Sequence, residues 1–107
     1  MADVENQVRE ALLEAIDEGL LALGPDASNV IRYYAEGSYR VKLEDVPDKL
    51  DIFCNILKAM LGTGGRVVEE VIARNLYNKL TLDFTKHDDW RLVDYVEDAK
   101  KLVGERK

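Results

Sequence analysis

Apolar residues recur every three or four positions along most of this chain, and glycines and a proline separate the stretches in which they do so. That spacing puts apolar side chains on one face of a helix, and glycine and proline commonly end helices. The strongest separators are Gly24-Pro25 and the turn Gly62–Gly65. The pattern therefore predicts five amphipathic helices, over residues 3–23, 26–36, 45–61, 65–80 and 89–103.

In two short segments, residues 39–44 and 80–85, the apolar residues alternate with polar ones instead. A period of two is typical of a half-buried extended segment. The predicted fold class is thus all-α, a compact five-helix bundle, in which these segments can pair as one short two-stranded ribbon. At 107 residues the chain has the size of a single domain, spanning residues 1–107.

The helical spacing also predicts which side chains fill the core. In the second helix we expect Val30, Ile31 and Tyr34 to face inward. The glycine turn should make the third and fourth helices antiparallel neighbours. The predicted core comprises Leu12, Ile16, Leu20, Ile31, Phe53, Leu57, Val68, Ile72, Leu76 and Val96.

Two predicted helices carry start signals in the sequence. Asp45-Val46-Pro47 should open the third helix, because proline suits the first turn. Either Asp88 or Asp89 should cap the fifth helix, because a short carboxylate can accept hydrogen bonds from the first backbone N–H groups.

Composition narrows the classes of partner. The net charge of −6 argues against nucleic acid and anionic membrane as partners, because their phosphates repel an acidic protein. A single cysteine cannot form an internal disulfide, which fits a reducing compartment. The acidic start lacks the basic and apolar stretches of a signal peptide, and every apolar run is too short to span a membrane. We therefore expect a soluble cytoplasmic protein.

Residues that commonly carry out chemistry are scarce, since His87 is the only histidine and Cys54 the only cysteine. His87 sits in a polar turn without a second ligand nearby, so we expect an exposed loop histidine rather than a metal site. Cys54 lies in mid-helix without a basic neighbour, so we expect a packing residue. We predict no enzyme, no catalytic residue, no metal and no cofactor, although a carboxylate-only site assembled across helices stays open.

Two binding hypotheses remain as alternatives. The helix start at Gly64, Gly65 and Arg66 can present backbone N–H groups to an anion or nucleotide, although a tight turn explains the glycines equally well. The segment Arg32–Lys42 mixes three tyrosines with basic residues and can stack nucleic-acid bases, although the acidic whole makes nucleic acid an unfavourable partner.

The leading hypothesis is a non-enzymatic protein-interaction or signal-output module, with a homodimer as one form of it. Leu13 and Leu21 lie off the main apolar stripe of the first helix, and such positions need covering if they are exposed. Tyr33 and Tyr39 are further interface candidates, because tyrosine is favoured at protein interfaces.

The chain also resembles a family of small archaeal helical domains, the Nitrosopumilus-type output domain of the fifth class, from about Val8 to Ala99. The resemblance lies in packing and turn patterns, and it implies an archaeal module that is attached to signalling proteins or acts beside them. It supplies no catalytic residues. The matching segments are Leu20-Leu21-Ala22-Leu23-Gly24, Ile31 with Tyr34, Leu43-Glu44-Asp45-Val46-Pro47, Leu61-Gly62 with Gly64, Leu76-Tyr77 before Leu80, and Val93-Asp94-Tyr95-Val96.

Overall fold

The computed structural model of the chain describes residues 2–106. Within this range there are five α-helices, one 3-10 helix and no strand, so the predicted all-α bundle is confirmed, whereas the alternating segments 39–44 and 80–85 form no ribbon. The same range contains no helix that is both long enough and apolar enough to cross a membrane. The elements are α1 (Ala2–Leu21), α2 (Pro25–Ser38), η1 (Leu43–Asp48), α3 (Leu50–Leu61), α4 (Gly64–Lys79) and α5 (Leu92–Glu105).

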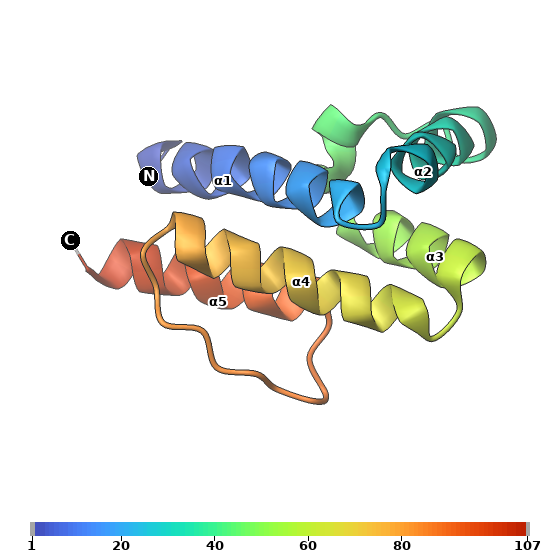
Figure 1. The fold of residues 1–107 in the computed structure, drawn as a ribbon. Coiled ribbons are helices and arrows are strands. Elements are labelled where there is room, and N and C mark those ends of the chain that lie inside the picture. Colours follow the sequence, from blue (N-terminus) through green and yellow to red (C-terminus); the bar gives the residue numbers. More distant parts are fainter. Residues whose placement is uncertain (1, 107) are drawn as a thin grey trace.

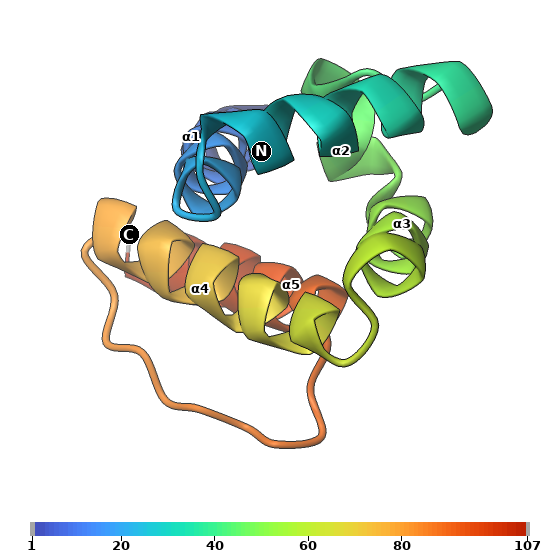
Figure 2. The ribbon, with the colours of Figure 1, turned by 45° about the vertical axis from the view of Figure 1, so that its right-hand side comes forward.

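Helix α1 packs mainly along α4 and also contacts α5. η1 lies beside the first half of α1, whereas α2 and α3 lie toward its end (Figure 1). The start of α1 and the end of α5 lie at the same end of the molecule (Figure 1). Residues 80–91, which join α4 to α5, form a long loop on the side of α4 that faces away from α1 (Figures 1 and 2). α3 and α4 are neighbours, as predicted, but they are not antiparallel: in Figure 2 α4 lies lengthwise across the view, whereas α3 is seen nearly along its axis.

The core is one cluster to which η1 and all five α-helices contribute. All ten predicted core residues are buried, none of them more than 4% exposed. The contact between α1 and α4 is close at Gly19, where an added Cβ atom would lie 2.6 Å from Cγ1 of Ile72. Glycine at this position therefore sets how closely the two helices approach.

The prediction that Val30 faces inward from α2 is wrong, because Val30 is 53% exposed. The helix packs on α1 and α3 through Ser28, Ile31 and Ala35, which are buried and are spaced three and four residues apart. At about 100° per residue, Val30 then falls toward the opposite side of the helix. Tyr34, also predicted to face inward, is half-buried.

The predicted third helix is divided in two, because residues 43–48 form η1 and α3 begins only at Leu50. Two hydrogen bonds from Arg9 of α1 hold η1 in place, one from Nη1 to Oδ1 of Asp48 (2.8 Å) and one from Nη2 to the carbonyl of Glu44 (3.1 Å). These partners are 39 and 35 residues from Arg9 in sequence, so local spacing gives no sign of them.

Helix α5 begins three residues later than predicted, and neither Asp88 nor Asp89 caps it. The N–H of Trp90 donates to the carbonyl of His87 (3.1 Å), which places Asp88 and Asp89 inside a turn before the helix. The capping contact comes instead from Asp94 inside the helix, whose Oδ2 accepts the backbone N–H of Arg91 (2.8 Å).

Helix α4 ends at Lys79, and Thr81, two residues further on, adopts a left-handed backbone conformation with φ of 59°. The N–H of Leu82 donates to the carbonyl of Tyr77 (2.8 Å), and the N–H of Thr81 donates to that of Asn78 (3.1 Å). This pair of bonds is a Schellman motif, in which glycine usually occupies the left-handed position.

Candidate functional site

One exposed face of α2 carries large apolar side chains. Val30 is 53% exposed and Tyr33 is 82% exposed, and the exposed Asp26 and Gly37 continue the same face toward the two ends of the helix. The spacings of four, three and four residues keep all four positions within a narrow strip. We call these four residues the α2 outer face.

The opposite face of α2 explains why this strip remains exposed. Ser28, Ile31 and Ala35 are already buried against the rest of the bundle. Arg32, between the two faces, donates from Nη2 to the carboxylate of Asp17 and from Nε to Oγ of Ser28. The inner side of α2 is thus fixed to α1, and Figure 2 shows α2 on the outside of the helix bundle.

The segment that follows α2 adds aromatic and basic groups. The rings of Tyr34 and Tyr39 meet edge to face, with centroids 5.5 Å apart. Electrostatic interaction with Tyr34, followed by burial, raises the pKa of Tyr39. Arg40 and Lys42 are exposed, and Arg40 has a positive φ of 55° that turns the chain away from the helix axis.

The four predicted interface residues have different surroundings. Tyr33 is the most exposed of them, Tyr39 is 37% exposed, and Leu21 is 50% exposed at the last residue of α1. Leu13 is half-buried within α1. Of the four, only Tyr33 belongs to the α2 outer face. Leu13 and Leu21 lie in α1, and Tyr39 follows the last residue of α2.

The glycine turn at residues 62–66 has a structural explanation. Gly62 has a positive φ of 59° and closes α3. A Cβ atom on Gly65 would lie 3.0 Å from both the carbonyl carbon and the oxygen of Leu57, so glycine allows α4 to start against the backbone of α3. Gly64 is the first residue of α4.

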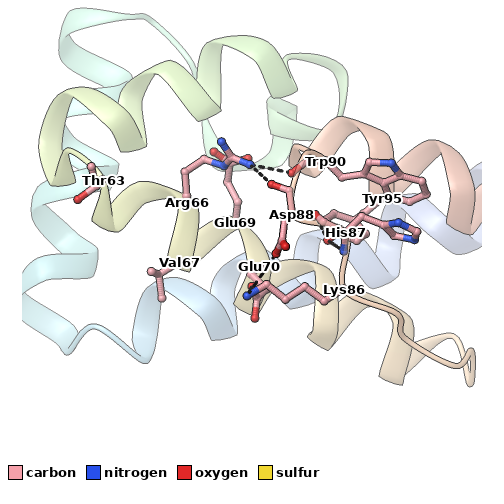
Figure 3. Close-up of a pocket in the computed structure, with 10 residues that line it drawn as sticks. All are labelled: Thr63, Arg66, Val67, Glu69, Glu70, Lys86, His87, Asp88, Trp90 and Tyr95. Carbon is pink, nitrogen blue, oxygen red and sulfur yellow. Dashed lines mark hydrogen bonds and ion pairs between the residues drawn. The ribbon is translucent and has the colours of Figure 1, made fainter.

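Arg66 does not project freely from that turn. Its Nη2 donates to the carbonyl oxygens of Asp88 (3.3 Å) and Trp90 (3.1 Å), which ties the loop 80–91 to α4 (Figure 3). A hollow of about 340 Å³ at the turn is lined by Lys58, Arg66 and Arg91, among others. Since Arg66 and Arg91 already bond to protein groups, anion binding there stays a prediction.

A second hollow, of about 380 Å³, lies between α4 and the loop 80–91 (Figure 3). Its charges are paired with one another, because Lys86 Nζ lies 3.3 Å from Oε1 of Glu70 and 3.8 Å from Oδ1 of Asp88. Burial acts to raise the pKa of Glu70, but hydrogen bonds from Lys86 and Arg74 outweigh it and lower that pKa.

His87, expected to be an exposed loop residue, is half-buried at this hollow. Its ring stacks on the indole of Trp90, with centroids 3.8 Å apart. Its backbone is held by Tyr95, whose hydroxyl accepts the N–H of His87 (2.8 Å) and donates to the carbonyl of the same residue (3.0 Å). In the part of the chain that the structure describes, no three His, Cys, Asp or Glu side chains converge as metal ligands.

Cys54 is buried, as the prediction of a packing residue requires. Burial is the main reason why the pKa of the thiol is raised to about 12, and the charge of Glu69 acts in the same direction. A thiol with this pKa stays protonated at neutral pH, and the thiolate is the nucleophilic form of cysteine.

Sequence reasoning missed the ion pair between Glu69 and Arg91. Glu69 is only 3% exposed, and it accepts hydrogen bonds from Arg91 Nε (3.0 Å), Arg91 Nη2 (2.8 Å) and the backbone N–H of Leu92 (3.0 Å). This hydrogen bonding raises the pKa of Arg91. A signal was present, because Glu69 precedes Ile72 and Leu76 by three and seven residues and so shares their apolar face.

Comparisons of the chain with models of protein families, with curated proteins and with solved structures found no match.

Proposed function

We propose that this chain is a non-enzymatic protein-interaction module that binds its partner through the α2 outer face. The observation that carries the proposal is the exposure of Val30 and Tyr33 on a helix whose other face is already packed. Exposed aromatic and aliphatic side chains on one strip bind well to protein, because their burial removes apolar area from water. Tyrosine is also among the residues that contribute most binding energy at interfaces.

The placement of the reactive side chains supports the non-enzymatic part of the proposal. Cys54 is buried and has a raised pKa, and the ring of His87 is stacked on Trp90. Both residues are therefore used in packing. The resemblance to archaeal output domains favours signal output as the form of the interaction, and the lone cysteine favours a cytoplasmic location.

Site-specific photo-crosslinking in the cells that make the protein would test this proposal. A photoreactive amino acid replaces Tyr33 in one variant and the exposed Lys101 of α5 in a matched control. We expect a discrete protein adduct from the Tyr33 position that is missing from the Lys101 position. The adduct partner, once purified, should bind the native chain and should not bind Y33E. Identical adducts from both positions, or full binding by Y33E, would contradict the proposal.

A further inference from the structure

The α2 outer face has the spacing of a helix-pairing seam. Asp26, Val30, Tyr33 and Gly37 are separated by four, three and four residues, which is the alternation that brings one stripe of a helix against a second helix. All four residues are exposed, and an added Cβ atom on Gly37 would have no heavy atom within 4 Å. A second helix can therefore approach the backbone closely at Gly37.

This seam is complementary to itself when two copies run antiparallel. A two-fold axis between Val30 and Tyr33 places Val30 of each copy against Tyr33 of the other. The same operation places Asp26 opposite Gly37, so that the small residue of one copy meets the helix start of the second. Such an interface uses one patch twice, as two-fold dimers do.

Charge favours an antiparallel pair of copies over a parallel one. Asp26 lies in the first turn of α2, and Arg40 lies two residues beyond the last residue of that helix, Ser38. Both side chains are exposed. The antiparallel arrangement brings each Asp26 toward Arg40 of the second copy, which gives two equivalent attractive pairs, whereas a parallel arrangement would place like charges together.

We propose that the occupant of the α2 outer face is a second copy of this chain, in an antiparallel α2–α2 homodimer. This inference rests on the proposed function, since it names the partner for the same surface. Helix α2 has only 14 residues, so the area that it buries lies at the small end of specific interfaces. The dimer is accordingly weak, and it forms in a concentration-dependent manner.

Sedimentation equilibrium at low salt, from about 10 µM to about 1 mM protein, measures the dimer dissociation constant. The test compares the native chain with D26R, R40D, the double variant D26R/R40D and Y33E. Each single charge reversal turns two attractive pairs into two repulsive ones, so we expect the dissociation constant to rise at least about tenfold. The double variant restores opposite charges and should dimerise within about threefold of the native chain.

An equimolar mixture of D26R and R40D provides a matched control. Each variant alone opposes like charges, but a mixed dimer pairs opposite charges at both ends, so the mixture should dimerise more strongly than either variant alone. Circular dichroism checks that each variant remains helical, and Asp tolerates the left-handed backbone at position 40. Raising the salt concentration should weaken the native dimer.

The outcomes separate this inference from the proposed function. A native chain that is monomeric at every concentration overturns the homodimer, and the Tyr33 crosslinking experiment then decides alone whether the α2 outer face binds another protein. A native dimer that Y33E leaves unchanged overturns the use of this face for self-association. A dimer that Y33E abolishes but charge reversal leaves unchanged overturns the antiparallel arrangement.

Discussion

Replacing Glu69 by glutamine should lower the free energy of unfolding by about 2 to 3 kcal/mol. Glutamine offers only one oxygen, so at least one bond now made to Arg91 becomes a contact between two donors. Loss of a hydrogen bond to a charged group costs about 1.5 to 3 kcal/mol. Breaking a fully buried ion pair costs about 3 to 5 kcal/mol, but the Arg91 side chain is 39% exposed and can regain water, which keeps the loss below that range.

Urea denaturation of E69Q measures this loss, and E70Q is the matched control. Glu70 is the next residue of α4, and it undergoes the same chemical change. Its side chain is 30% exposed, and it pairs with Arg74 (3.2 Å) and Lys86 (3.3 Å) at the surface. Surface ion pairs contribute about 0 to 1 kcal/mol, so E70Q should stay within about 1 kcal/mol of the native chain. Equal losses from E69Q and E70Q would refute the reasoning from burial.

Three further predictions concern backbone and thiol positions. Gly19→Ala should destabilise the protein by about 1 to 3 kcal/mol, because the added methyl group overpacks against α4. Gly104→Ala, on α5, adds its methyl group in open space and should stabilise the protein by about 0.5 to 1 kcal/mol. Thermal unfolding measures both changes, and melting temperatures that shift in the same direction would contradict this pair of predictions. Thr81→Gly should raise the free energy of unfolding by about 1 kcal/mol, and with it the melting temperature, because a β-branched residue is strained at a φ of 59°. A lower melting temperature for this variant would contradict the prediction. At pH 8, Cys54 of the folded chain should react with a thiol reagent at least about a thousandfold more slowly than Cys54 of the urea-unfolded chain. The reason is that a pKa of about 12 leaves far less thiolate than the ordinary value of 9.0. Equal reaction rates in the two states would contradict this prediction.

The sequence predicted those parts of the fold that depend on local spacing. Leu12, Ile16 and Leu20 share a face of α1 at four-residue intervals, and all three are buried. The orientation of α2 could not be predicted in the same way, because its sequence contains two stripes with helical spacing. Only the packing of α2 against α1 and α3 decides that Ile31 faces inward and Val30 outward.

The alternating segments show a second limit of local pattern. Val41 is buried, and Leu82 and Phe84 pack against the core, so the apolar positions were identified correctly. A strand also requires a partner for its backbone N–H and carbonyl groups, and period two alone does not supply one. Here Leu43 begins a 3-10 helix instead, and residues 82–86 form part of the loop between α4 and α5.

The candidate sites depended on contacts between distant parts of the chain. At the glycine turn the sequence indicated an anion site at Gly64, Gly65 and Arg66, but the Arg66 side chain reaches carbonyl groups 22 and 24 residues further along. Glu69 likewise finds Arg91 across 22 residues. For the α2 outer face, the sequence identified Tyr33 but not its neighbour Val30, because the direction of each stripe is a tertiary property.

The attachment of the loop 80–91 has a consequence for how this protein can vary. Arg66 holds the loop through the carbonyl groups of Asp88 and Trp90, and the Tyr95 hydroxyl holds it through the N–H and carbonyl of His87. Every residue has a backbone carbonyl, and every residue except proline has a backbone N–H. At residues 87, 88 and 90 the loop is therefore held through backbone atoms, so substitutions at Asp88 can alter the surface chemistry of the hollow while this part of the loop keeps its shape.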